Sequence, residues 1–319
     1  MQDHSVIQDA GGRQFKTLRV SLLSHCNMAC TYCTDGKVKP ALHPIQDHGR
    51  LKDMILCLHE MLQFRAIRFT GGEPLLYPHL IALIDALHRE LKDVPLRLTT
   101  NGYLLASKAD ALYAAGIQSV NVSLDAGNQD AFYRITKRRG WSKVLQGIEA
   151  AAASGMGVKI NSVIMKGVNE QEIVPLLDYG RAHGVPVRYL ELMKMGHLHT
   201  DYNVHFFSMR EILHVLRSSG IDFTAMERIK HSTARYWQLP DGYCFGIIAN
   251  ETASFCHDCD RLRIDSHGNI YGCLSRNLPV NVYQFLNNDE KLKEALQKAL
   301  LHKQAAFTGS RLPMIAIGG

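Results

Sequence analysis

Short runs typical of buried β-strands alternate with helical patterns between residues 18 and 192 of this chain. In the segment 51–63, for example, Met54, Leu58 and Met61 recur at the helical period and share one helix face. Repeated strand and helix units predict a parallel sheet, because each crossover helix returns the chain to the end of the sheet from which it started. The six strand-like runs are residues 18–23, 66–70, 96–100, 119–124, 158–164 and 187–192.

Alternate positions within these runs differ in polarity. One set is apolar, as in Val20, Phe69 and Val122, and would face the covering helices. The other set is polar and would face the inside of a barrel. A complete eight-stranded barrel fills its interior with branched apolar side chains, so a polar interior predicts a wider cavity that holds a ligand. Antiparallel strands with one face in water would give the same alternation, although the helical spacers argue against them. The polar set comprises Arg19, Ser21, Arg68, Thr70, Arg97, Thr99, Asn121, Ser123, Asp125, Lys159, Asn161 and Arg188.

The polar set carries far more positive than negative charge, since its cations face only the carboxylate of Asp125. A cavity lined in this way would attract a polyanion. The formal net charge of +6 is compatible with an anionic ligand, but over a chain of this length it is commonly a matter of solubility. The hypothesis therefore depends on where the cations lie. They are Arg19, Arg68, Arg97, Lys159 and Arg188.

Three cysteines, Cys26, Cys30 and Cys33, follow the first strand-like run in a short loop. Iron–sulfur clusters are normally held by four cysteine thiolates. Three thiols would leave one iron of a 4Fe–4S cluster open, where a small molecule can coordinate. The spacing suits a cluster better than one tetrahedral ion, because zinc ligands usually come as two pairs. Three core cysteines and a zinc knuckle are the alternatives.

A second set of three, Cys256, Cys259 and Cys273, lies nearer the C-terminus. Between them, Arg261 and Arg263 alternate along a strand-like run and would project to the same side. Two guanidinium groups beside a metal centre suit phosphate or the edge of a nucleobase. The alternative is structural zinc, with a fourth ligand chosen from His257, His267 or Cys244.

Cysteine usage and hydropathy indicate the compartment in which the protein works. Eight cysteines are too few for a disulfide scaffold, and two tight clusters indicate metal binding in a reducing compartment. Cys57 is predicted to be a core thiol and Cys244 to be buried. No apolar run approaches the roughly 18 residues of a membrane span, and the first residues do not resemble a secretory signal. These features predict a soluble, cytoplasmic protein.

Two further helices are predicted towards the C-terminus. Ser208 is a suitable N-cap for an amphipathic helix that runs through Leu216, and Gly220 would end it. A last helix is expected within residues 288–303.

As a set, these motifs resemble the molybdenum cofactor biosynthesis protein A family, the GTP 3′,8-cyclases of the radical S-adenosylmethionine (radical SAM) superfamily. The resemblance runs from about residue 11 to the C-terminus. It is highly specific as a combination, whereas only the cysteine groups are specific alone. The other motifs are Gly71-Gly72-Glu73-Pro74, Thr99-Thr100-Asn101-Gly102, Asn121-Val122-Ser123-Leu124-Asp125, Val158-Lys159-Ile160-Asn161 and the terminal Gly318-Gly319.

The resemblance implies an α/β fold, an incomplete (βα)6 barrel of the TIM type with a C-terminal extension. Residues 1–205 would form the radical SAM partial barrel. Residues 206–319 would carry a second 4Fe–4S cluster and the Gly-Gly tail, which in the family reaches into the active site.

The resemblance also implies roles for individual residues. The first cluster would be held by Cys26, Cys30 and Cys33, and the second by Cys256, Cys259 and Cys273. Arg261 and Arg263 would be catalytic as well as substrate-binding. SAM contacts would come from Tyr32, Gly72, Ser123 and Met193, and GTP contacts from Arg19, Arg68, Thr99, Lys159, Arg261 and Arg263.

In this family the adenosyl radical takes the 3′ hydrogen of the ribose and the carbon radical then attacks guanine C8. The product, 3′,8-cyclo-7,8-dihydro-GTP, belongs to the first step of molybdopterin (molybdenum cofactor) biosynthesis. The implied partners are GTP and an electron donor protein such as flavodoxin or ferredoxin, with no nucleic acid and no membrane. The implied assembly is a monomer or homodimer.

Several positions depart from the family pattern. Residues 21–25 replace Ser-Val-Thr-Asp-Arg, Ala29 stands where arginine is common, and residues 34–35 replace Met-Pro. Ala66 and Asp260 occupy positions that often hold lysine and asparagine. These departures leave room for a radical SAM paralogue that acts on another nucleotide, or on a peptide with the second cluster as an auxiliary. A non-enzymatic module that binds zinc is a third hypothesis.

Overall fold

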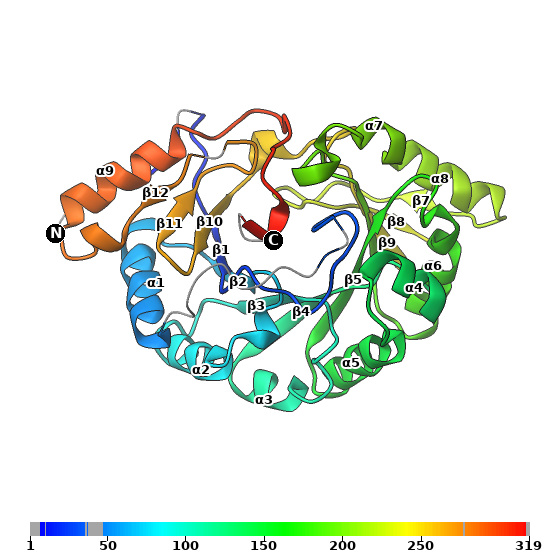
Figure 1. Cartoon of the computed structure of the whole chain (residues 1–319), viewed down its shortest axis with the longest axis horizontal. Coiled ribbons are helices and arrows are strands. Elements are labelled where there is room, and N and C mark those ends of the chain that lie inside the picture. Colours follow the sequence, from blue (N-terminus) through cyan, green and yellow to red (C-terminus); the bar gives the residue numbers. More distant parts are fainter. Residues whose placement is uncertain (1–6, 10, 36, 38–46, 277, 317–319) are drawn as a thin grey trace.

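The computed structural model describes residues 7–9, 11–35, 37, 47–276 and 278–316, so the predicted Gly-Gly tail lies outside it. The described strands form one 12-stranded sheet in the order β12-β11-β10-β1-β2-β3-β4-β5-β6-β9-β8-β7. Figure 1 shows this sheet bent into an open arc with helices along its convex side. The strands are β1 Thr17–Ser21, β2 Ala66–Thr70, β3 Leu96–Thr100, β4 Ile117–Ser123, β5 Gly157–Ile164, β6 Val187–Glu191, β7 Thr224–Ala225, β8 Arg235–Gln238, β9 Cys244–Ile248, β10 Arg261–Asp265, β11 Asn269–Tyr271 and β12 Val280–Asn281.

Strands β1 to β6 form the centre of the sheet and pair in parallel in chain order. They coincide with the six predicted strand-like runs, with bounds that differ by a residue or two at some ends. The parallel sheet that the strand and helix alternation predicted is therefore confirmed.

The C-terminal part of the chain extends this sheet at both edges. Strand β10 pairs in parallel with β1, and β9 pairs in parallel with β6. Strands β11 and β12 continue one edge, and β8 and β7 the other, in antiparallel pairing. Among the described residues, β12 and β7 end the sheet without pairing with each other, so the predicted incomplete barrel is confirmed. The division at residue 205 stays a prediction, since strands from both sides of it share this sheet.

The apolar set of strand positions packs under the helices, as predicted. Val20, Ile67, Phe69, Leu98 and Val122 have no exposed surface. Burying such side chains is the main favourable term in forming the wall of the arc. The helices are α1 His48–Leu62, α2 Leu80–Glu90, α3 Ala109–Ala114, α4 Gln129–Thr136, α5 Trp141–Ala153, α6 Ile173–Ala182, α7 Tyr202–His205, α8 Met209–Ser218 and α9 Asp289–Leu300.

Both C-terminal helices begin where the sequence predicted. Ser208 caps α8, because its hydroxyl accepts from the Glu211 amide while the Glu211 carboxylate accepts from the Ser208 amide. This reciprocal pair is a capping box. Asn288 caps α9 through the Lys291 amide. Every helix in the described ranges is too short or too polar to span a bilayer.

The segment after α9 crosses the open side of the arc (Figure 1). Ser310 forms an isolated parallel bridge with Met195, and the Gly196 amide donates to the Ser310 carbonyl at 3.0 Å. The C-terminal residues that the structure describes thereby lie against the loop that follows β6.

The capping box makes a testable contribution to stability. Ser208→Ala removes the side chain that bonds to Glu211 and should lower the free energy of unfolding by about 1 kcal/mol in urea denaturation. Ser218→Ala, at the exposed other end of α8, is the matched control and should cost less than about 0.5 kcal/mol. Equal losses in the two variants would contradict a stabilising cap.

Candidate active site

The concave side of the sheet encloses a cavity of about 860 Å³. This volume lies within the range of about 300–1,000 Å³ that is typical of small-molecule sites. Strands β1 to β6 and β10 contribute side chains to its wall. Cysteines of both sets also line it, namely Cys33 of the first set and Cys256, Cys259 and Cys273 of the second. The fold therefore brings the two distant cysteine motifs to one chamber.

Four arginines lie side by side across the wall of this cavity. The sheet register places Arg263 of β10 beside Arg19 of β1, Arg19 beside Arg68 of β2, and Arg68 beside Arg97 of β3. Neighbouring strands are about 4.8 Å apart. Like charges directly opposite each other in a sheet are destabilising. We call these four residues the arginine row.

Burial and repulsion from neighbouring arginines both act on Arg19, Arg68 and Arg263. Burial is the larger cause and neighbouring arginines the smaller one in lowering the pKa of Arg68 to about 9 and that of Arg263 to about 10. The same two causes hold the pKa of Arg19 well below its ordinary value. An anion bound in the cavity would offset both effects, because it pairs with charges that are otherwise desolvated and close together.

The predicted positive lining of the interior is confirmed. All five cations of the polar set line the cavity, and Arg261, Arg263 and Lys303 add to them. The carboxylates in the lining are those of Asp125, Glu191 and Asp260. Lys159 is exposed, at the cavity surface, whereas the other members of the polar set are more covered.

Arg188 was counted in the polar set but was absent from the predicted substrate contacts. It is 9% exposed on β6 and lines the cavity. Its Nε and Nη2 atoms have no hydrogen-bond partner among the described residues. A buried guanidinium with free donors is costly unless a ligand pairs with it. Its parity on the strand was the signal that could have placed it in the site.

The first cysteine loop is tied to its surroundings through Cys26 and Tyr32. Cys26 Sγ accepts from Asn101 Nδ2 at 3.6 Å and from the Met28 amide at 3.4 Å. The Tyr32 hydroxyl donates to the buried Asp125 carboxylate at 2.8 Å. Burial, followed by the charge of Asp125 and of its neighbouring thiols, raises the pKa of Cys30 well above its ordinary value.

This environment fits a metal cluster. Burial is also the main cause that raises the pKa of Cys26 to about 11. Such thiols hold their protons until a cation takes the place of those protons, since the metal ligand is the thiolate. Because Cys26, Cys30 and Cys33 lie close enough to act on one another electrostatically, they form a donor set that suits an iron–sulfur cluster.

The two glycines of the Gly71–Pro74 motif lie against this cysteine loop. A Cβ atom on Gly72 would lie 2.0 Å from the His25 carbonyl oxygen, and one on Gly71 would lie 2.7 Å from that of Leu23. The Gly72 amide donates to the Leu23 carbonyl oxygen at 2.7 Å. The close approach that the glycines permit is thus to the backbone of the cysteine loop.

Glu73 joins its own loop to the end of β3 and the loop that follows it. Its carboxylate accepts from the Leu75 amide at 3.0 Å, the Thr100 hydroxyl at 2.6 Å and the Asn101 amide at 2.7 Å. Asn101 in turn reaches Cys26. Burial of Glu73 is the dominant cause that raises its pKa to about 7, and the three hydrogen bonds oppose this rise.

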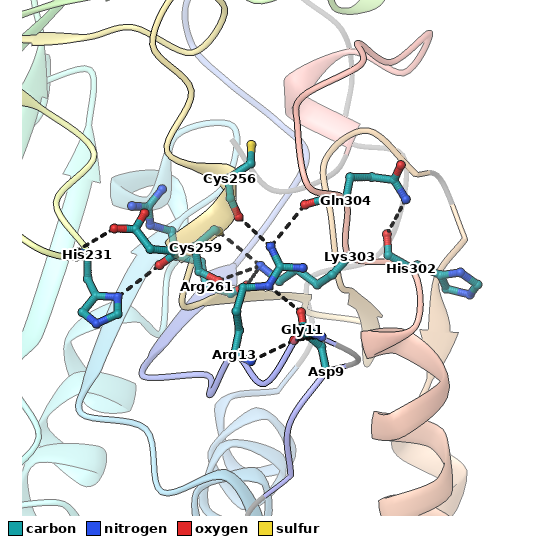
Figure 2. Close-up of polar contacts among 11 residues, drawn as sticks. Asp9, Gly11, Arg13, His231, Cys256, Cys259, Arg261, His302, Lys303 and Gln304 are labelled. Atoms are coloured by element: carbon teal, nitrogen blue, oxygen red, sulfur yellow. Dashed lines mark hydrogen bonds and ion pairs between the residues drawn. The ribbon is translucent and has the colours of Figure 1, made fainter.

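The second cysteine set is held from both ends of the chain (Figure 2). Arg13, paired with Asp9, donates through Nη1 to the carbonyl oxygens of Cys256 at 2.5 Å and Gln304 at 3.2 Å. Lys303 Nζ donates to Cys259 Sγ at 3.1 Å. Burial tends to raise the pKa of the Cys259 thiol, but the charges of Lys303 and Arg261 outweigh it, and the pKa lies below its ordinary value.

The three thiols of this set influence one another electrostatically. Burial and then the charges of Cys259 and Cys273 raise the pKa of Cys256. Among the described residues, no group of three His, Cys, Asp or Glu side chains is placed to hold a single metal ion. Cys244, a possible fourth zinc ligand, lies on β9. The six strands β1 to β6 separate β9 from β10 in the sheet. All eight cysteines lie in the described ranges, and none forms a disulfide.

Most of the predicted site residues meet at the cavity. Gly72, Cys26 and Cys30 do not line it, and they lie in the loops beside it. Cys57, predicted to be a core thiol, packs partly buried on α1 and donates to the Leu286 carbonyl. The site residues that line the cavity are Arg19, Tyr32, Cys33, Arg68, Thr99, Ser123, Lys159, Met193, Cys256, Cys259, Arg261, Arg263 and Cys273.

Comparisons with known proteins agree with this arrangement. The family model described as "Radical SAM superfamily" matches residues 20–180, so the chain is a radical SAM protein. "Molybdenum Cofactor Synthesis C" matches residues 185–308. The GTP 3′,8-cyclases of Aliarcobacter butzleri and Helicobacter pylori (strain J99) are each 33% identical to the chain, over 92% and 93% of its length and equal shares of their own. The chain belongs to the GTP 3′,8-cyclase family.

The fold alone is shared with more distant proteins. The structure of Streptococcus suis SuiB bound to precursor peptide SuiA has a TM-score of 0.63 and 14% identity. The match covers 95% of this chain and 72% of that one. As a member of the radical SAM superfamily, the protein uses SAM and an iron–sulfur cluster, and a second cluster is consistent with its family.

The buried carboxyl of Glu73 predicts a pH dependence of stability. In the folded protein it keeps its proton up to about pH 7, whereas an unfolded glutamate loses it near its ordinary pKa of 4.5. The free energy of unfolding should therefore fall as the pH rises from 4.5 to 7. Glu73→Gln should be less stable than the wild type overall. Because its side chain has no proton to lose, its free energy of unfolding should fall less as the pH rises.

Urea denaturation of the metal-free protein between pH 5 and 8 measures this difference. Glu60→Gln, on the exposed side of α1, is the matched control and should keep the wild-type slope. A Glu73→Gln slope equal to that of the control would contradict a raised pKa.

Proposed function

We propose that the protein converts GTP to 3′,8-cyclo-7,8-dihydro-GTP, the first step of molybdenum cofactor biosynthesis. The observation that carries this proposal is the arginine row, which lies in a cavity lined by members of both cysteine sets. A triphosphate supplies negative charge that would pair with these four adjacent cations, of which Arg263 is buried and the other three are partly covered. The relatives of the chain that are named GTP 3′,8-cyclases support the same substrate.

The proposed substrate contacts divide into two groups. Arg19, Arg68, Thr99 and Lys159 would bind the triphosphate, and Arg188 would join them through Nε and Nη2, which have no partner among the described residues. Arg68 is already oriented, because its Nη1 donates to the Leu98 carbonyl at 2.9 Å and lies 3.4 Å from the Thr99 hydroxyl. Arg261 and Arg263 lie on β10 beside the second cysteine set and would hold charge near the reacting nucleoside.

The cofactor contacts are also part of the proposal. Cys26, Cys30 and Cys33 would hold the first cluster, and Tyr32, Gly72, Ser123 and Met193 would contact SAM. Cys256, Cys259 and Cys273 would hold the second cluster. When bound, the first cluster and SAM supply a carbon radical that abstracts a hydrogen atom. The protein itself orients the ribose and guanine and excludes water, which accounts for its share of the rate.

The chain's own departures from the family bear on substrate selection. Asp260 lines the cavity between Cys259 and Arg261, and its carboxylate accepts from the Thr17 hydroxyl at 3.3 Å. A carboxylate there would favour a base edge that donates hydrogen bonds, as the amide and amino groups of guanine do. The peptide-modifying alternative has no comparable support, since a cavity with this excess of cations suits a polyanion.

The proposal extends to the electron donor, the compartment and the oligomeric state. An electron donor such as flavodoxin or ferredoxin would reduce the first cluster, and the protein would act in the cytoplasm as a monomer or homodimer.

The cluster assignment can be tested by metal analysis. Protein reconstituted under anaerobic conditions should bind about eight irons per chain, as two four-iron clusters require. Cys273→Ala should bind about four, whereas Cys244→Ala, a cysteine outside both sets, should keep about eight. Equal iron in all three proteins would contradict the assignment of Cys273, and zinc in place of iron would favour the binding-module hypothesis.

The substrate assignment can be tested through Arg68. Arg68→Met removes a charge-assisted contact and should lower kcat/KM for GTP by roughly 10- to 100-fold. Cleavage of SAM in the absence of GTP should remain unchanged. Arg89→Met, whose exposed arginine pairs with Asp85 on α2, is the control and should behave as the wild type. No GTP-dependent product from the wild type would overturn the proposed function.

A further inference from the structure

Lys303 follows α9 and reaches back to the second cysteine set (Figure 2). Its Nζ atom donates to Cys259 Sγ at 3.1 Å, to the Arg261 carbonyl at 2.8 Å and to the Cys259 carbonyl at 3.4 Å. A lysine ammonium has three hydrogen-bond donors, so these three acceptors account for all of them. Although Lys303 lines the cavity, its charge is directed to a cysteine sulfur and to backbone oxygens.

The position of Lys303 is built into the fold at several points. A Cβ atom on Gly272 would lie 2.1 Å from the Ala299 carbonyl oxygen, so this glycine lets the segment before Cys273 pack on the end of α9. The Lys303 amide donates to the Leu300 carbonyl at 3.0 Å. The ammonium also lies 5.1 Å from the ring centre of Phe15, which is 2% exposed.

Arg13 makes a useful contrast. It reaches the same cysteine segment, but it donates to the carbonyl oxygen of Cys256 and so contacts backbone. Lys303 contacts the sulfur atom itself. Hydrogen bonds to cysteine sulfur and the net charge around a cluster are two of the factors that set its reduction potential.

We propose that Lys303 is a positioning residue of the second cluster, which holds the Cys259 sulfur in place and raises the reduction potential of that cluster. This inference rests on the proposed function, because it takes Cys256, Cys259 and Cys273 as cluster ligands. Reduction adds negative charge to a cluster, and a fixed cation beside one ligand stabilises the reduced form. Removing the cation therefore makes the cluster harder to reduce.

The test compares Lys303→Met, Lys303→Gln and Lys303→Arg with the wild type as anaerobically loaded holoenzymes. The control is Lys298→Met, which removes a lysine from the exposed side of α9. Iron content is measured first. The potential of the second cluster is then measured by redox titration followed by electron paramagnetic resonance, and the signal of this cluster is identified by its loss in Cys273→Ala.

We expect Lys303→Met to shift the ratio of reduced to oxidised second cluster about tenfold towards the oxidised form at a given potential, or about 59 mV for one electron. Lys303→Arg keeps the charge and should restore most of the potential, and Lys298→Met should not change it. Should Lys303→Met fail to retain the second cluster, Lys303→Gln, which keeps a neutral donor, should retain it with a lowered potential.

The inference is overturned if the wild type holds about eight irons and the potentials of Lys303→Met or Lys303→Gln equal those of the wild type. It is also overturned if the reduction potential of the second cluster falls as far in Lys303→Arg as in Lys303→Met. A wild type that binds only about four irons would instead refute the proposed function, so the two failures are distinguishable.

Discussion

Repulsion within the arginine row is the physical constraint on which the rest of this structure depends. Four guanidinium groups at one level of a parallel sheet, each on a neighbouring strand, oppose the closing of the sheet around them. The apolar face of the same strands, buried under α1 and its neighbours, provides the opposing stabilisation. In an open cavity that holds an anion, the apolar face of the sheet stays buried and the charges of the arginine row are compensated.

The parallel pairing of β10 with β1 determines how the two halves of the site meet. It places Arg263 beside Arg19, and it brings the segment that carries Cys256 and Cys259 to the N-terminal edge of the barrel wall. Arg13 from the start of the chain and Lys303 from its end then fix that segment. The second cysteine set is therefore held by residues nearly 300 positions apart, and its geometry depends on the whole sheet.

Backbone contacts and hydrogen bonds also connect the loops that follow β1, β2 and β3. The glycines at 71 and 72 allow the backbone of their loop to touch the first cysteine loop, and Glu73 links the same loop to the end of β3. Through Asn101 this linkage reaches Cys26. A change in any one of these loops would therefore move Cys26 as well as the backbone that surrounds it.

The sequence by itself determined the six central strands, the helix cap at Ser208, the place of the last helix, the polar interior and both cysteine sets. These features depend on local periodicity, capping chemistry and short spacings, which are legible in neighbouring residues. Only the tertiary structure decided that β9 and β10 extend the sheet at its two edges, that four arginines share one level, and that Arg188 has unpaired donors. It also decided that Lys303 contacts Cys259. The physical reason is that register and side-chain contacts between distant segments are set by the packing of the whole sheet, and no local pattern encodes which strand lies beside which.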